Sequence, residues 1–148
     1  VALNQGLDGG LSEAQALAMA APFSVSLGES GCMCGALSGA VMASGLFLGN
    51  HRPHRHRREM RDSARELYDS FKAENGATCC SALSRKVKHD RKAHFQHCAN
   101  LTAEAAESAA RLILRKRPGL ATGADKGFLS GRESKIGGLL LKLIRFFR

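Results

Sequence analysis

Five cysteines are the residues of this chain whose type and spacing suit redox or metal chemistry. They occur as Cys32-x-Cys34, as the adjacent pair Cys79 and Cys80, and as the single Cys98. Because their number is odd, they cannot all pair with one another inside the chain. None of the spacings matches a zinc finger or a CxxCH haem attachment site. The cysteines alone therefore leave open a metal or cluster site, a redox-active thiol pair, or inert core residues.

The first two cysteines open an uncharged, glycine-rich stretch, Gly31–Gly49. Its glycines recur mostly every fourth residue, and residues four apart share one face of a helix. We predict a buried helix on which a second backbone or a cofactor can approach closely at Gly35 and Gly39. Cys32 and Cys34 would lie at its N-terminal end, where the helix dipole stabilises a thiolate. The other faces carry apolar residues that can be buried, Leu37, Val41, Met42, Leu46 and Phe47. Two alternatives remain, a transmembrane helix with a small-residue dimer face and plain close packing with both cysteines in the core.

The elements that must position the cysteines are predicted to be helices. Leu11–Ala21 has a capping-box pattern at Ser12 and Gln15 and ends at Pro22, and Phe23–Ser30 is expected to be a loop. Glu59–Glu74 and Cys98–Arg117 have helical periodicity. The apolar residues expected to face the core are Met60, Ala64, Leu67, Tyr68 and Phe71 in the first of these two helices, and Leu101, Ala105, Ala109, Leu112 and Ile113 in the second. The predicted fold class is all-α, a compact helical bundle with a glycine-faced central helix and about four to five core helices.

The whole chain has a formal net charge of +9, and its basic residues are concentrated in one part of the sequence. Residues 1–50 hold no Lys or Arg, whereas residues 51–118 hold 16 basic and 8 acidic residues. Such local excess indicates a surface that faces a partner. The run His51–Arg58 could bind phosphate or a metal through His51, His54 and His56, or it could be a solvated loop. Arg85–His97 is expected to be solvated surface or loop. The basic run lacks interleaved aromatic residues, which argues against nucleic-acid binding.

The composition changes after Arg117, which divides the chain into a helical domain at 1–117 and an appendage at 118–148. Leu120–Lys135 is expected to be a linker, and Ile136–Arg148 a basic amphipathic helix. The apolar stripe of this helix is Ile136, Leu140, Leu143, Ile144 and Phe147. The pattern fits a membrane surface, a dimer mate or the protein's own core, so a homodimer and a peripheral membrane contact are both candidate assemblies. No signal peptide is visible, although a start upstream of Val1 leaves one open. The expected location is cytoplasmic, with a membrane-peripheral position as the alternative. Since the chain opens at Val1, we expect further residues upstream.

Three segments resemble the C-GCAxxG-C-C family of proposed redox proteins. They are CGALSGA at Cys34–Ala40, GATCCSAL at Gly76–Leu83, and Cys98 with the Ala-Asn-Leu that follows it. The resemblance covers about residues 10–115 and implies a small helical redox protein whose family cysteines fall on Cys34, Cys80 and Cys98. Cys32 and Cys79 are additional, and the family's first cysteine would lie upstream of Val1. The chain is also similar to the iron–sulfur-like subdomain of split-Soret cytochromes c, which implies a cluster.

The leading functional hypothesis is a redox protein that binds a metal or an iron–sulfur cluster and passes electrons to a redox protein partner. Its ligands would be Cys34, Cys80 and Cys98, which should approach one another, with Cys32 and Cys79 as further candidates. In a crystal handled in air we expect either an empty site or an adventitious disulfide that involves Cys32 or Cys79. The second hypothesis is thiol–disulfide exchange without a metal, and the third is an interaction module with inert cysteines. The sequence leaves open whether the protein is an enzyme, but it lacks the motifs of ordinary hydrolases and nucleotide-binding proteins.

Overall fold

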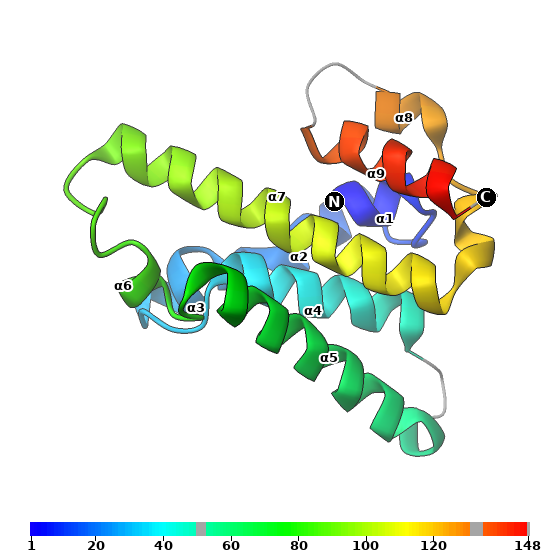
Figure 1. Cartoon of the computed structure of the whole chain (residues 1–148), viewed down its shortest axis with the longest axis horizontal. Coiled ribbons are helices and arrows are strands. Elements are labelled where there is room, and N and C mark those ends of the chain that lie inside the picture. The colour runs from blue at the N-terminus through cyan, green and yellow to red at the C-terminus, as the bar shows by residue number, and fades with distance from the viewer. Residues whose placement is uncertain (50–52, 131–134, 148) are drawn as a thin grey trace.

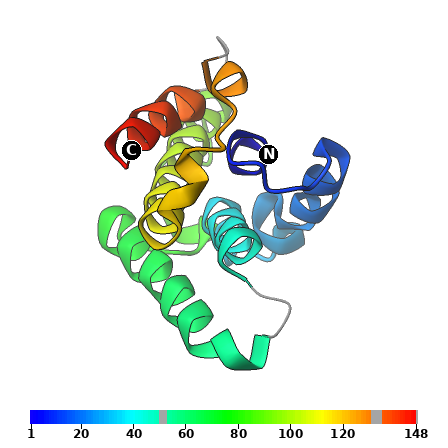
Figure 2. The same cartoon turned by 90° about the vertical axis from the view of Figure 1, so that its right-hand side faces the viewer.

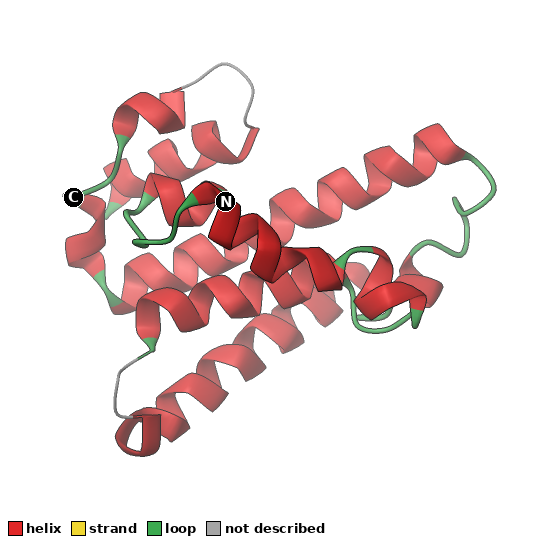
Figure 3. Ribbon diagram, turned by 180° about the vertical axis from the view of Figure 1, so that it is seen from behind, coloured by secondary structure: helices red, strands yellow, loops and turns green. Residues whose placement is uncertain are grey.

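All regular structure in the described part of the chain is helical, which confirms the predicted all-α class (Figure 3). The computed structural model describes residues 1–49, 53–130 and 135–147, with the side chains of 53–56 and 135–137 left aside. His51, His54 and His56 therefore lie outside the described side chains. The elements are α1 (Ala2–Gly6), α2 (Glu13–Ala20), η1 (Ala21–Phe23), α3 (Val25–Glu29), α4 (Gly35–Leu48), α5 (Pro53–Asn75), α6 (Cys80–Leu83), α7 (Arg91–Lys116), η2 (Pro118–Ala121), α8 (Lys126–Ser130) and α9 (Lys135–Phe146).

Helix α4 is the predicted central helix, and it packs against α7 and α5 (Figure 1). Viewed at right angles, it lies between α5 and the N-terminal helices (Figure 2). The helix begins only after Cys34, so Gly31 and Cys32 precede it. Its buried face carries Leu37 and Leu48, whereas Leu46, which we expected to be buried, is 38% exposed. That expectation was wrong because one side of α4 borders the cavity described below.

Helix α7 has the predicted buried face but begins earlier than predicted. Its core residues are Leu101, Ala105, Ala109, Leu112 and Ile113. The start predicted at Cys98 was wrong, because the Asp90 carboxylate accepts hydrogen bonds from the backbone N–H groups of Lys92 and Ala93. This N-cap satisfies donors that a helix start leaves open. Part of the basic segment predicted as solvated surface or loop is therefore the first turns of α7, where Arg91, Lys92 and Phe95 are exposed.

The segments from α1 to α3, residues 2–29, are called here the N-terminal arm and lie beside α4 (Figure 2). The capping box predicted at Ser12 is present, since its hydroxyl accepts from the Gln15 N–H and the Gln15 side chain accepts from the Ser12 N–H. Where a loop was predicted at Phe23–Ser30, the chain turns tightly through α3, whose backbone is not that of a regular α-helix. Its residues Ser26, Leu27 and Gly28 all have positive φ, a conformation that no periodicity of side chains reveals.

The C-terminal helix α9 packs on α7, α8 and α1. Leu140, Leu143 and Ile144 of its apolar stripe are buried, which is docking on the protein's own core, whereas the Ile136 side chain lies outside the described residues. The linker predicted at Leu120–Lys135 was wrong where described, because η2 and α8 fold there around buried Ala121 and Leu129. A homodimer and a membrane-surface contact stay predictions. No helix in the described part of the chain is long and apolar enough to cross a membrane.

Candidate redox site

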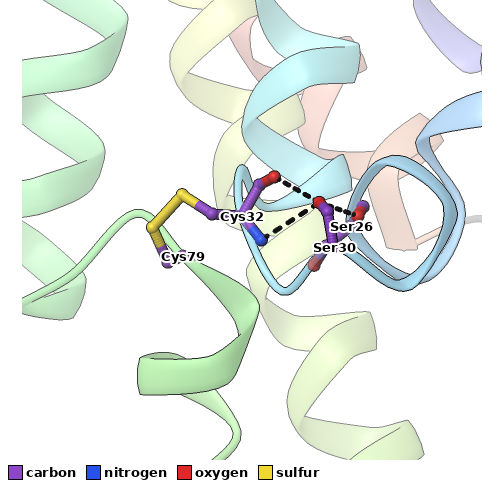
Figure 4. The surroundings of a disulfide bond; sticks show 4 residues. All are labelled: Ser26, Ser30, Cys32 and Cys79. Carbon is purple, nitrogen blue, oxygen red and sulfur yellow. Dashed lines mark hydrogen bonds between the residues drawn. A yellow bond between two sulfur atoms is a disulfide. The ribbon is translucent and has the colours of Figure 1, made fainter.

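Two segments far apart in sequence are joined directly at the start of α4. The backbone N–H of Cys34 donates to the carbonyl oxygen of Thr78 at 2.8 Å, and the N–H of Ser81 donates to the carbonyl oxygen of Gly31 at 3.1 Å. A disulfide between Cys32 and Cys79 links the same two segments (Figure 4). Gly31 has a φ of +80°, which favours glycine. The two segments are thus fixed side by side by backbone and covalent bonds together.

Ser30 holds the Cys32 loop from the other side (Figure 4). Its hydroxyl lies within hydrogen-bonding distance of two carbonyl oxygens, those of Ser26 and Cys32, at 2.6 Å each. It also accepts a hydrogen bond from the Cys32 N–H at 3.4 Å. The Ser30 hydroxyl therefore contacts both backbone polar groups of Cys32, one end of the disulfide.

The three cysteines outside the disulfide are free thiols that line one cavity. Cys34 is the N-cap residue of α4, Cys80 begins α6, and Cys98 lies in the N-terminal part of α7. The cavity has a volume of about 1040 Å³, and its walls come from the N-terminal arm, α4, α6 and α7. The structure thus brings Cys34, Cys80 and Cys98 to one place, whereas Cys32 and Cys79 are not among the lining residues.

The glycine face of α4 has two different uses. A methyl group at Gly35 would collide with the carbonyl oxygen of Phe23, so this glycine permits two backbones to approach closely. A methyl group at Gly39 or Gly45 would meet no atom within 4 Å outside its own helix, and both residues line the cavity. Gly39 therefore leaves open space beside the thiols. A cofactor contact at Gly35 or Gly39 stays a prediction.

The surroundings of Cys34 favour its protonated form. Burial raises the pKa of the Cys34 thiol above its ordinary value, and the charge and hydrogen bonding of Cys80 raise it further. The nearby backbone N–H groups of Ala36 and Leu37 lower the pKa, but they do not outweigh burial. The thiolate predicted for Cys34 at the helix N-terminus is therefore not favoured, because desolvation is the larger effect. The pKa of Cys98 is raised in the same way, first by burial and then by the charge of Cys80.

The three free thiols are chemically suitable metal ligands, but their side chains are not positioned around one ion. Thiolates are the ligands that iron–sulfur clusters and zinc prefer. Among the described residues, however, no three His, Cys, Asp or Glu side chains are arranged to hold one metal ion. The disulfide also occupies Cys32 and Cys79, which were candidate ligands. A disulfide involving one of these residues was one of the two outcomes expected from the sequence, and the structure pairs them with each other.

Two other polar residues at the cavity were missed from sequence. His94 lies one helical turn before Cys98 on α7, and both line the cavity. The four-residue spacing of His94 and Cys98 places them on one face of a helix. This signal was not used in the prediction from sequence, because the helix was predicted to start only at Cys98. The second is Ser26, which is 1% exposed and whose hydroxyl has no hydrogen-bond partner. No pattern in the sequence could have identified it.

Fold and site together define a small helical protein with free cysteines gathered at one cavity. A family model described as "Putative redox-active protein (C_GCAxxG_C_C)" matches residues 1–112. The chain belongs to this family. The match runs from α1 into the last turns of α7 and includes all five cysteines. No curated protein and no solved structure matches the chain.

Proposed function

We propose that the protein is a thiol redox protein that exchanges two electrons with the disulfide of a partner protein. The observation that carries this proposal is the convergence of three free thiols, Cys34, Cys80 and Cys98, on one cavity. Cys34 and Cys80 are the redox-active pair of this proposal. Backbone hydrogen bonds join their segments, and the charge and hydrogen bonding of Cys80 raise the pKa of Cys34.

The two thiols of the pair take different roles. Cys80 is only partly buried, so a partner disulfide can reach it, and its thiolate attacks one partner sulfur. That attack forms a mixed disulfide and releases the other partner sulfur as a thiolate. Cys34 is 4% exposed and holds its proton more tightly than an ordinary thiol, which suits the second step. It loses its proton to solvent and attacks the Cys80 sulfur, which expels the partner's second thiolate. The protein is oxidised to a Cys34–Cys80 disulfide, and the partner disulfide is reduced to two thiols after it takes up two protons.

A second candidate function is binding of a metal or an iron–sulfur cluster by Cys34, Cys80 and Cys98, with electron transfer to a redox protein partner. The observation that favours it is the open space that Gly39 leaves in the cavity wall beside the thiols. Binding would require the three side chains to draw closer than they lie here, since they do not form a ligand group for one ion.

Two measurements separate the candidates. The first is the iron, zinc and acid-labile sulfide content of protein purified without oxygen, together with its visible absorbance. Stoichiometric metal would favour the second candidate, and its absence together with a reducible disulfide between Cys34 and Cys80 would favour the first. The second measurement traps the mixed disulfide with a disulfide-bonded peptide and detects it by mass spectrometry. In Cys34→Ser the mixed disulfide should accumulate at Cys80, and in Cys80→Ser it should not form. If Cys80→Ser reacts as fast as the unaltered protein, the proposed roles are wrong.

A further inference from the structure

The loop between α6 and α7 connects the two helices that carry Cys80 and Cys98, and it is strongly basic. Its exposed cations are Arg85, Lys86 and Lys88, and the exposed Arg91 and Lys92 follow in the first turn of α7. We propose that these five residues, called here the basic loop, dock an acidic redox protein whose disulfide reacts at the cavity. The inference rests on the thiol chemistry proposed above and adds the chemical nature of the partner.

The basic loop begins and ends at the cavity. Ser84 precedes it, lines the cavity and donates its hydroxyl hydrogen to the Cys80 carbonyl oxygen at 2.7 Å. His94 follows the loop and lines the cavity one helical turn before Cys98. A partner that contacts the loop would therefore be held next to the segments that carry two of the three free thiols.

The basic loop keeps most of its positive charge. In the part of the chain that the structure describes, none of the five cations takes part in an ion pair, whereas Arg58, Arg65, Arg111 and Arg115 each do. The single carboxylate within this stretch, Asp90, accepts hydrogen bonds from the backbone N–H groups of Lys92 and Ala93, and its charge offsets one of the five cations. Clustered charge of one sign steers a partner of opposite charge and raises its association rate.

An exposed aromatic side chain adjoins the charge and favours a protein as the partner. Phe95 is 77% exposed and lies one turn beyond Arg91 on α7. Protein interfaces commonly combine an apolar or aromatic anchor with a polar, charged rim. The basic loop and Phe95 together provide both parts of such a surface beside the reactive cysteines.

The test uses three peptides that differ only in charge. Each contains one cysteine capped as a mixed disulfide with thiopyridine, flanked by four Glu, four Gln or four Lys residues. A protein thiolate attacks the peptide sulfur, forms the protein–peptide disulfide and releases coloured pyridine-thione, which reports the rate. At low ionic strength the Glu peptide should react about 10-fold faster than the Gln peptide, and the Lys peptide more slowly than either. High salt should remove most of the difference, because it screens exposed charges.

Two triple variants of equal charge change make the test specific. Arg85→Glu, Lys86→Glu and Lys88→Glu together should abolish the preference for the Glu peptide. Lys126→Glu, Lys142→Glu and Arg145→Glu together should keep it, since α8 and α9 lie at the other end of the molecule from α6 (Figure 1). Circular dichroism checks that both variants fold. Equal rates for the three peptides with the unaltered protein, or equal losses in both variants, would overturn the proposal.

Failure of the basic loop is distinguishable from failure of the thiol chemistry. If the Gln peptide reacts at Cys80 but charge has no effect, only the docking proposal is wrong. If no peptide reacts at Cys80, the thiol chemistry itself is wrong.

A labelled DNA duplex tests whether the basic loop binds a nucleic acid instead of an acidic protein. If the loop variant loses binding to the duplex while the peptide rates are independent of charge, the loop serves a nucleic acid and the docking proposal is overturned.

Discussion

The backbone N–H of Cys34 donates a hydrogen bond to the carbonyl oxygen of Thr78, 2.8 Å away. This bond joins the N-cap residue of the central helix to the segment that carries Cys79 and Cys80. The bond from Ser81 N–H to Gly31 and the disulfide from Cys32 to Cys79 reinforce the same contact. The placement of Cys34 beside Cys80 is therefore set by the backbone and by a second pair of cysteines. The free thiols can change their redox state without being needed to hold the two segments together.

Removal of the Cys32–Cys79 disulfide should lower stability without removing the free thiols. The two residues are 47 positions apart, for which the loop-entropy argument gives about 4 kcal/mol, the upper end of the roughly 2–4 kcal/mol that a disulfide typically contributes. We expect the double variant Cys32→Ser, Cys79→Ser to lose this amount in urea denaturation. A reductant should lower the stability of the unaltered protein to a similar level and leave the variant unchanged. A variant as stable as the oxidised protein would show that the link contributes nothing.

Alanine substitutions at Gly35 and Gly39 should have opposite effects on stability. At Gly35 the added methyl group collides with the Phe23 carbonyl oxygen, and such overpacking costs about 1–3 kcal/mol. At Gly39 the methyl group enters open space, and Ala is favoured over Gly within a helix by up to about 1 kcal/mol. Thermal denaturation of the two single variants measures the contrast. Equal destabilisation by both would mean that Gly39 does not face open space.

The sequence predicted the long helices well because their periodicity is a local property. The core face of α7 from Leu101 to Ile113 and the buried stripe of α9 at Leu140 and Ile144 both repeat at helical spacing. Such spacing leaves one face to be buried whatever covers it. What covers the stripe of α9 is a tertiary property, so the pattern alone allowed a membrane, a dimer mate or the protein's own core.

The site was predicted less completely, because it depends on contacts between distant segments. Cys32 and Cys79 are paired through two loops whose course no periodicity describes. The balance at Cys34 was predicted with the wrong sign, since the sequence shows a helix N-terminus but not how deeply the thiol is buried. The convergence of Cys34, Cys80 and Cys98 came from the family resemblance rather than from the spacing of the residues.

Truncation of the apolar stripe on α9 should destabilise the whole domain. Ile144 is 1% exposed in the core that α9 shares with α7, so Ile144→Ala removes buried contacts and leaves a cavity. Substitutions of this kind cost about 2–5 kcal/mol. Lys142→Ala on the exposed face of the same helix is the matched control and should change stability by less than about 0.5 kcal/mol. Urea denaturation checks both. If Ile144→Ala unfolds at the same urea concentration as Lys142→Ala, α9 does not support the core.

Cys80 should influence how the reactivity of Cys34 and Cys98 changes with pH. The pKa of each of these two thiols is raised, first by burial and also by Cys80. In reduced protein, the alkylation rate of each should therefore reach half its maximum at a pH above the ordinary thiol pKa of 9.0. Cys80→Ala removes the neighbouring charge, which makes ionisation easier and should move both midpoints down, though not fully, because burial remains. Alkylation by iodoacetamide at a series of pH values, with each cysteine resolved by peptide mass spectrometry, measures the midpoints. A raised pKa also means that the folded state holds the proton more tightly than the unfolded chain. The contribution of the protonated Cys34 thiol to the stability of the reduced protein is then fully present below pH 9.0, and it is lost as the pH rises through the folded-state pKa of Cys34. Midpoints that do not respond to Cys80→Ala would show that the three thiols do not share one electrostatic environment.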